Sequence, residues 1–208
     1  MSGRDAWASE PWPAPVLDEE DLTRRLALAG PLDMTRGMFP RSTLEAVRVL
    51  GEEAVRRCEQ ASGEERLVEF LTYPVGAHLR MVFVAARLLE ARCGGFDPAL
   101  RELGLRAARC FLESAAGIAL QLVGGGSVKG LVGHLPSAWR AWVSFGARSV
   151  LWTGPTSGRL TMRREFMPHP FQEGVLLGVL DKAHARGARV RGCQLSTLES
   201  DYEVSWEA

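Results

Sequence analysis

The sequence predicts an α+β protein with a helical N-terminal part followed by ββαββ, whose strands form a four-stranded antiparallel sheet. Two observations support this prediction. Apolar residues recur at helical spacing as far as about residue 143, and beyond it they alternate with polar residues, as in strands. Hydrophobic residues make up 46% of the 208 residues, enough for a sizeable core. We expect residues 17–208 to form one domain, and residues 1–16 to be a loose N-terminal arm.

The helical part reads as a series of helices separated by Gly and Pro. Acidic residues open the first helix, where carboxylates complement the helix dipole, and Ser42 with Glu45 predicts a capping box for the second. The expected helices are one from about residue 18 to Gly30-Pro31, one from Ser42, one over 52–60, one after Ser62, one over 76–92, one from Asp97, a small apolar one over 114–123 and one over 127–143.

The C-terminal part contains two predicted hairpins with a helix between them. Residues 149–153 and 159–163 form the first hairpin around the turn Gly154-Pro155. A helix runs from Pro170 to about residue 185, and residues 188–197 and 201–206 form the second hairpin. Helices followed mostly by strands favour α+β over alternating βαβ units.

Charge and cysteine usage exclude several classes of function. Lys+Arg and Asp+Glu are 25 each, so no overall field attracts nucleic acid or anionic membrane. The N-terminus has no signal-peptide pattern and the chain has no 18-residue apolar run, so we expect a cytoplasmic protein without a membrane span. Four scattered cysteines without a C-x-x-C pair predict reduced thiols and no metal site.

No catalytic motif is present. The four histidines form no H-x-x-x-H or H-E-x-x-H pattern, and no G-x-S-x-G elbow occurs. Catalytic groups that meet only in space are not visible at this level. An enzyme acting on a small hydrophobic substrate therefore stays open as the alternative to a non-enzymatic protein.

One helix face provides the candidate ligand pocket. Leu131, Leu135, Trp139 and Trp142 are spaced 4, 4 and 3 residues apart, so they share a face, and Trp152 follows on the next strand. Aromatic side chains supply large apolar walls. The candidate pocket residues are Tyr73, His134, Trp139, Trp142 and Trp152.

Each of these residues also has a structural interpretation. The tryptophans fit a plain core, His134 a packed helix residue, and Tyr73 with Pro74 the end of a helix. Of the two helix tryptophans, we expect Trp139 to contact ligand, because it lies close to His134 and Pro136, and Trp142 to be core.

Several segments resemble a large paralogous family of myxobacterial proteins of unknown function, from about residue 22 to 206. They are Arg36-Gly37-Met38-Phe39 before Leu44-Glu45-Ala46-Val47, Tyr73-Pro74, Leu100-Arg101-Glu102-Leu103-Gly104, Gly117, and Tyr202-Glu203-Val204-Ser205-Trp206. That family is similar in layout to haem–nitric-oxide-binding domains, 4-vinyl-reductase-type domains, aromatic-sensing domains of bacterial activators and small subunits of the transport protein particle.

This wider resemblance implies a ligand sensor or a dimeric scaffold. We therefore expect a non-enzymatic regulatory, sensing or scaffold protein, a homodimer that binds a small apolar ligand or a protein partner but no nucleic acid. The haem-binding members carry a Tyr-x-Ser-x-Arg motif, which this chain lacks, and His134 only approximates the position of their proximal histidine. The 4-vinyl-reductase-type members have a Cys-rich end, where this chain has Cys193 alone. We expect neither haem nor another cofactor.

Overall fold

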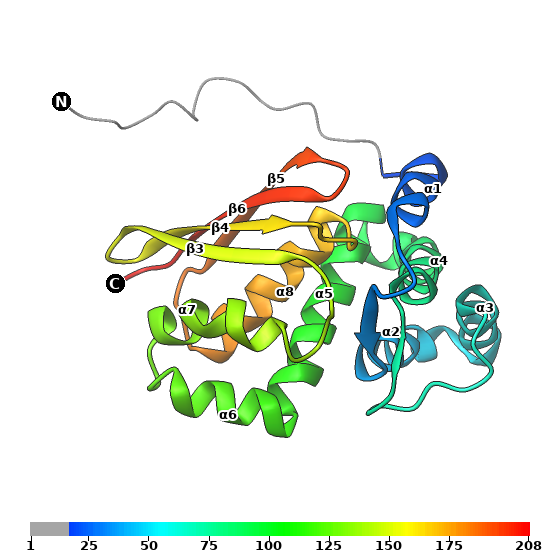
Figure 1. Ribbon diagram of the computed structural model, residues 1–208, viewed down its shortest axis with the longest axis horizontal. Helices are drawn as coiled ribbons and strands as arrows, with labels where there is room; N and C mark the ends of the chain where they lie inside the picture. Colours follow the sequence, from blue (N-terminus) through cyan, green and yellow to red (C-terminus); the bar gives the residue numbers. More distant parts are fainter. Residues whose placement is uncertain (1–16) are drawn as a thin grey trace.

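A twisted four-stranded sheet forms one layer of the molecule, and helices cover one of its faces (Figure 1). The computed structural model describes residues 17–208, so the predicted arm 1–16 lies outside the described residues. The strands are β3 (Ala147–Gly154), β4 (Ser157–Arg163), β5 (Arg189–Ser196) and β6 (Glu199–Ser205). Their order is β3-β4-β6-β5 with every neighbouring pair antiparallel, and α8 (His169–Lys182) connects the two hairpins. The predicted fold class is confirmed.

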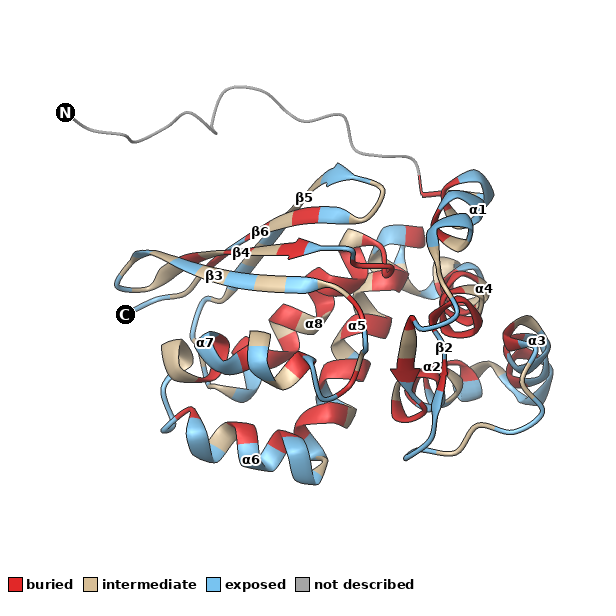
Figure 2. Ribbon diagram, viewed as in Figure 1, coloured by how far each residue is buried: buried red, intermediate tan, exposed pale blue. Residues whose placement is uncertain are grey.

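Alternation along the two central strands decides which face of the sheet is covered. Leu160 and Met162 of β4, and Tyr202 and Val204 of β6, are buried, whereas their neighbours along each strand are more exposed. Leu160 pairs with Tyr202, so these side chains emerge on the same face. Figure 2 shows the buried positions of the helices gathered toward this face.

The helical part precedes the sheet, as predicted. Its elements are α1 (Glu19–Leu28), β1 (Met34–Arg36), α2 (Met38–Val47), the short 3₁₀ helix η1 (Arg48–Leu50), α3 (Glu52–Ser62), β2 (Thr72–Pro74), α4 (Val75–Cys93), α5 (Phe96–Glu113), α6 (Ala115–Val123) and α7 (Val128–Trp139). Local chemistry sets several of the ends. Asp18 caps α1 by accepting hydrogen bonds from the amides of Glu20 and Asp21, and Ser114 caps α6.

Two glycines allow α5 and α8 to pack backbone against backbone. A Cβ added at Gly104 of α5 would lie 1.8 Å from the carbonyl oxygen of Phe171, and one added at Gly174 of α8 would lie 1.9 Å from that of Arg101. No real Cβ tolerates such a distance, so both positions require glycine. This contact fixes the relative position of α5 and α8, and with it the residues at the start of α8.

The prediction that Ser42 caps a helix is wrong. Helix α2 begins earlier, at Met38, and Ser42 lies inside it, where its hydroxyl donates to the carbonyl of Phe39 at 2.8 Å. Pro40 is compatible with this earlier start because the amides of the first helical turn have no intrahelical partner, so its missing N–H costs nothing.

The helix expected after Ser62 is also absent. Gly63 ends α3 in a left-handed conformation, and an irregular segment follows in which Phe70 is 73% exposed. The phenol of Tyr73 accepts a hydrogen bond from the Val68 amide at 2.7 Å and donates to the carbonyl of Arg66 at 3.0 Å. These two bonds satisfy backbone groups that helical bonds would otherwise serve.

A small two-stranded sheet, not predicted from the sequence, places Trp142. Thr35 of β1 pairs with Tyr73 of β2, and the other edge of β1 is bonded to the turn after α7. The Arg36 amide donates to the carbonyl of Trp142 at 3.0 Å, and the Ser144 amide donates to that of Met34 at 3.0 Å. The segment that carries Trp142 is therefore held from the helical part of the molecule.

Candidate functional site

A cavity lies where α2 and α4 meet α5, α7 and α8. Its empty volume, including the mouth, is about 550 Å³, and the centre of a water molecule can move through about 50 Å³ of it. Strand β1, helices α2, α4, α5, α7 and α8, and the segments that follow α7 and β4 all contribute side chains. The lining consists of Thr35, Phe39, His78, Ala107, Ala108, Phe111, Leu135, Trp139, Trp142, Val143, Phe145, Glu165, Met167, Phe171, Gln172, Val175 and Val179. The wall is mostly apolar and rich in aromatic rings.

Three polar atoms of this wall have no hydrogen-bond partner within residues 17–208. They are Nδ1 of His78, Nε1 of Trp142 and Oε1 of Gln172, on side chains that are 3%, 7% and 3% exposed. A buried polar atom without a partner costs about 1–3 kcal/mol, and such atoms are few in folded proteins. Three of them around one cavity indicate a place where a bound molecule supplies the missing bonds.

The hydrogen bonds of Thr43 determine the tautomer of His78. We assign the Thr43 hydroxyl proton to the carbonyl of Phe39, 3.3 Å away, because a carbonyl can only accept; the hydroxyl oxygen then accepts from Nε2 of His78, also at 3.3 Å. Desolvation in this buried position lowers the pKa of His78 to about 3, so the imidazole is neutral at pH 7. With its single proton on Nε2, Nδ1 is a bare acceptor.

A buried ion pair closes one side of the cavity. Glu165 binds Arg148 of β3, and both side chains are at most 5% exposed. The other oxygen of Glu165 accepts from the Met167 amide at 3.0 Å, and the Arg148 guanidinium stacks on the Trp139 ring at 5.0 Å. Because the carboxylate is already paired and hydrogen-bonded, it presents no free charge to the cavity.

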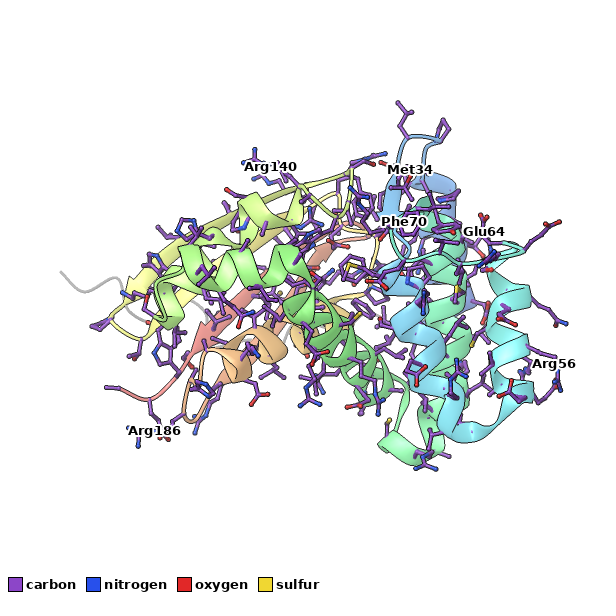
Figure 3. The ribbon with its side chains drawn as sticks, turned by 90° about the horizontal axis from the view of Figure 1, so that it is seen from below. Met34, Arg56, Glu64, Phe70, Arg140 and Arg186 are labelled. Carbon is purple, nitrogen blue, oxygen red and sulfur yellow. The ribbon has the colours of Figure 1, made fainter. Side chains whose placement is uncertain are left out.

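The structure brings two of the five candidate residues to this cavity. Trp139 is the last residue of α7, and the Trp142 amide bonds to its carbonyl at 3.0 Å, so Trp142 lies just beyond the helix instead of on it. Both indoles line the cavity, and Trp142 also packs against Phe39 and Phe111. Arg140, between them in the chain, points outward (Figure 3).

The other three candidates lie outside this cavity. Tyr73 is buried, but its hydroxyl serves the loop before β2. His134 is exposed on α7 and does not line the cavity. Trp152 is half-buried on β3, where its ring packs edge-on against Trp206 under Lys129. The helical face predicted from the three spacings is correct for Trp139, whereas Trp152, on β3, packs with Trp206 instead.

Sequence reasoning missed His78, Gln172 and Glu165. A usable signal exists for two of them: His78 and Gln172 are polar residues inside otherwise apolar helical segments, and both are buried. Glu165 has no such signal, because it lies in a short connection and meets Arg148 only through the hairpin.

Two further searches within residues 17–208 gave negative results. No three His, Cys, Asp or Glu side chains lie together in a way that would hold a metal ion. None of the helices in this part of the chain is both long enough and apolar enough to cross a bilayer.

Comparison with known proteins places the chain in a family. Residues 29–207 match the model of the family described as "Protein of unknown function (DUF2378)", and the chain belongs to it. No curated protein matches.

Several solved structures have the same fold. An Fe(II) unliganded H-NOX protein from K. algicida is 13% identical with a TM-score of 0.66, and the match covers 83% of this chain and 97% of that one. An H-NOX protein from S. oneidensis in the Fe(II)NO ligation state is 10% identical with a TM-score of 0.59, covering 83% and 99%. An oxygen-binding H-NOX domain related to soluble guanylate cyclases is 9% identical with a TM-score of 0.59, covering 83% and 95%. At these identities the likeness concerns the fold alone.

The cavity residues of this chain do not fit a haem. His134 is exposed and does not line the cavity, and Nε2 of His78, the histidine that does line it, is hydrogen-bonded to Thr43. Space of about 50 Å³ for the centre of a water molecule corresponds to a few waters, far less than a porphyrin requires. In this chain, the fold therefore encloses a cavity that is too small for a haem.

Proposed function

We propose that this member of the family is a non-enzymatic sensing or regulatory protein that binds a small, uncharged, largely apolar molecule in the cavity described above. One observation carries the proposal: an apolar cavity whose polar wall atoms are buried and unpartnered in the protein alone. The neighbouring solved structures, whose names describe ligand-binding domains, support a sensor built on this fold. The balanced net charge argues against nucleic acid as partner.

The enzyme alternative has less support in the cavity. A nucleophile needs an adjacent base that accepts its proton, but the Thr43 hydroxyl donates to a backbone carbonyl and only accepts from His78. Glu165 is tied to Arg148, and no cysteine lines the cavity. These groups can hold a ligand, but none is arranged to attack or deprotonate one.

Native mass spectrometry of the full chain purified from its own host tests the proposal. We expect a bound small molecule that is lost on denaturation and is released intact. A chain that carries no ligand from its own cells, and whose melting temperature does not respond to an extract of them, would contradict the proposal. A ligand recovered in a chemically altered form would favour the enzyme.

We also propose that the protein is a homodimer formed through α6. This helix has no ionisable side chain, and Ile118, Leu122 and Val123 are 52%, 77% and 65% exposed. It lies at the edge of the molecule, packed only on α5 and α7 (Figure 1). An apolar helix with an exposed face of this kind marks an interaction surface.

Charges beside α6 favour a second copy as the partner. An open groove next to Ile118 and Leu122 is lined by Glu113 on one helix and Lys182 on another. A two-fold axis between these two charges would place the Glu113 of each copy near the Lys182 of the other. The uncharged side chains of α6 would then pack against the same side chains of the second copy, without charge repulsion.

A charge-reversal experiment tests this dimer. Sedimentation analysis should show that Leu122→Glu dissociates it, that Glu113→Lys and Lys182→Glu each weaken it, and that the two combined restore it. Leu151→Glu, at a site on β3 that is 65% exposed, is the control and should leave it intact. A monomeric wild-type chain, or a Leu122→Glu chain that stays dimeric, would contradict the assignment, as would binding of the wild-type monomer to lipid vesicles.

A further inference from the structure

We infer that the ligand of the cavity carries a hydroxyl group on an uncharged apolar body of about the size of a single ring. This inference rests on the proposed binding function and adds the chemical class of the ligand. It follows from which hydrogen-bonding atoms of the wall are unpaired, and from which of them donate and which accept.

The unpaired atoms comprise one donor and two acceptors. Nε1 of Trp142 carries a hydrogen and can only donate, and Oε1 of Gln172 can only accept. Nδ1 of His78 is an acceptor because the ring proton lies on Nε2, facing Thr43. A hydroxyl group is the smallest organic group that can accept a hydrogen bond from Nε1 of Trp142 and donate one to Oε1 of Gln172 or Nδ1 of His78.

Other neutral groups match this set less well. A carbonyl, ether or halogen accepts from Trp142 but leaves both His78 and Gln172 without a donor. A hydrocarbon leaves all three atoms unpaired, each at the cost of a buried polar group. A site whose buried polar atoms await a hydroxyl discriminates strongly against the analogue that lacks it.

Charged groups do not suit the cavity. A carboxylate would face the two bare acceptors, and it would lie in the same cavity as the carboxylate of Glu165. An ammonium would point a hydrogen at the Trp142 N–H, and Glu165 is already paired with Arg148. Either ion would also lose its hydration inside a largely apolar wall, which costs far more than one hydrogen bond returns.

The rings that surround the three atoms define the apolar body. Phe39, Phe111 and Trp142 pack against one another on one side of the cavity, and Phe171 packs edge-on against His78 on another. The narrow free space favours one ring or a short branched chain over a polycyclic or long-chain molecule.

Three probes of equal heavy-atom number test the ligand class. Benzyl alcohol, ethylbenzene and benzylamine differ only in the last atom, which is a hydroxyl oxygen, a methyl carbon or, at pH 7, an ammonium nitrogen. Isothermal titration of the full chain should show binding of benzyl alcohol at least about tenfold tighter than ethylbenzene, and no binding of benzylamine.

Two substitutions that preserve side-chain shape assign the preference to the wall atoms. Gln172→Met removes the acceptor and Trp142→Phe removes the donor, and each keeps an apolar side chain in place. We expect each variant to bind benzyl alcohol about tenfold more weakly, with binding of ethylbenzene unchanged or tighter. Trp206→Phe, which changes an indole outside the cavity, should leave both affinities unchanged. Thermal melts confirm that each variant is folded.

The outcomes separate the ligand class from the binding function. Ethylbenzene or benzylamine binding as tightly as benzyl alcohol would overturn the ligand class and leave the proposed function standing. If Gln172→Met and Trp142→Phe weakened the binding of benzyl alcohol and ethylbenzene equally, the ligand class would likewise be overturned and the proposed function would stand. If none of the probes binds and native mass spectrometry finds no ligand, the cavity holds water only, and both proposals fail.

Discussion

Where α1 and α8 approach β5, the buried charges are paired within the protein, whereas the polar wall atoms of the cavity are neutral and unpaired. At that contact, the Arg25 guanidinium, 2% exposed, donates to Asp21 at 2.7 Å and to Gln194 of β5 at 3.1 Å. Nearby, Glu173 of α8 binds Arg101 and accepts from the Gly192 amide at 2.6 Å. In the cavity, by contrast, neutral polar atoms remain unpaired.

This difference distinguishes structural polar groups from binding ones. A buried charge is tolerated only with a partner: Asp21 and Arg25 pair within α1, and Arg25 and Glu173 gain further partners from distant elements. The cavity atoms face a smaller penalty because they are neutral, and no other group of residues 17–208 is hydrogen-bonded to them. We expect changes at the first region to affect mainly folding and changes at the second mainly binding.

The largest expected effect is at Arg25. Arg25→Met leaves the carboxylate of Asp21 buried without its partner, which should cost about 3–5 kcal/mol in the free energy of unfolding, measured by urea titration. Arg24→Met is the matched control, since Arg24 pairs with Glu20 at the same spacing but with side chains 49% and 76% exposed. That control should lose less than about 1 kcal/mol. Similar losses for both would show that burial does not set the difference.

Truncation of Trp139 should come next. Trp139→Ala removes a buried indole that supports both Leu135 and the Arg148 guanidinium, so we expect a loss of about 3 kcal/mol or more in thermal or urea unfolding. This expectation replaces the initial assignment of Trp139 as the ligand-contacting residue and Trp142 as core, because the unpaired N–H belongs to Trp142. A near-neutral Trp139→Ala would restore the initial assignment.

A pH titration of stability isolates His78. Burial lowers its pKa to about 3, whereas the unfolded chain has the ordinary value of about 6.5. The unfolded state therefore binds the proton first, and stability falls as pH drops below 6.5, by about 1.4 kcal/mol per pH unit, or about 2 kcal/mol by pH 5. His78→Phe should remove this part of the slope. An unchanged slope would contradict a buried neutral imidazole.

The smallest expected effect on stability is that of Trp142→Phe. The substitution removes an unpaired N–H and keeps a ring against Phe111, so the free energy of unfolding should change by less than about 1 kcal/mol. Urea titration measures the change. A loss as large as that of Trp139→Ala would mean that the indole N–H is bonded within the protein, and the comparison between the two regions would no longer hold.

The elements with strong local patterns were predictable, and the cavity mostly was not. Alternation such as that of Leu160 and Met162 and the turn at Gly154-Pro155 identify the strands, because these signals lie within a few residues. The prediction that Ser42 caps a helix was wrong because Pro40 is compatible with an earlier start of α2, at Met38. His78, Gln172 and Trp142 meet only through the packing of α4 and α8 with the turn bonded to β1, and no local pattern records that meeting.

The glycine contact between α5 and α8 has a mechanical consequence. With carbonyl oxygens seated at Gly104 and Gly174, these two helices cannot slide or separate without losing the contact, so the wall that bears Phe111 and Gln172 keeps its position. Another part of the wall is carried by α7, which contains Pro136, and by the turn with Trp142. A molecule that enlarges the cavity would therefore shift walls other than α5 and α8; one of these is α7, which packs on α6. Occupancy of the interior would then be transmitted to the exposed helix at the edge of the protein.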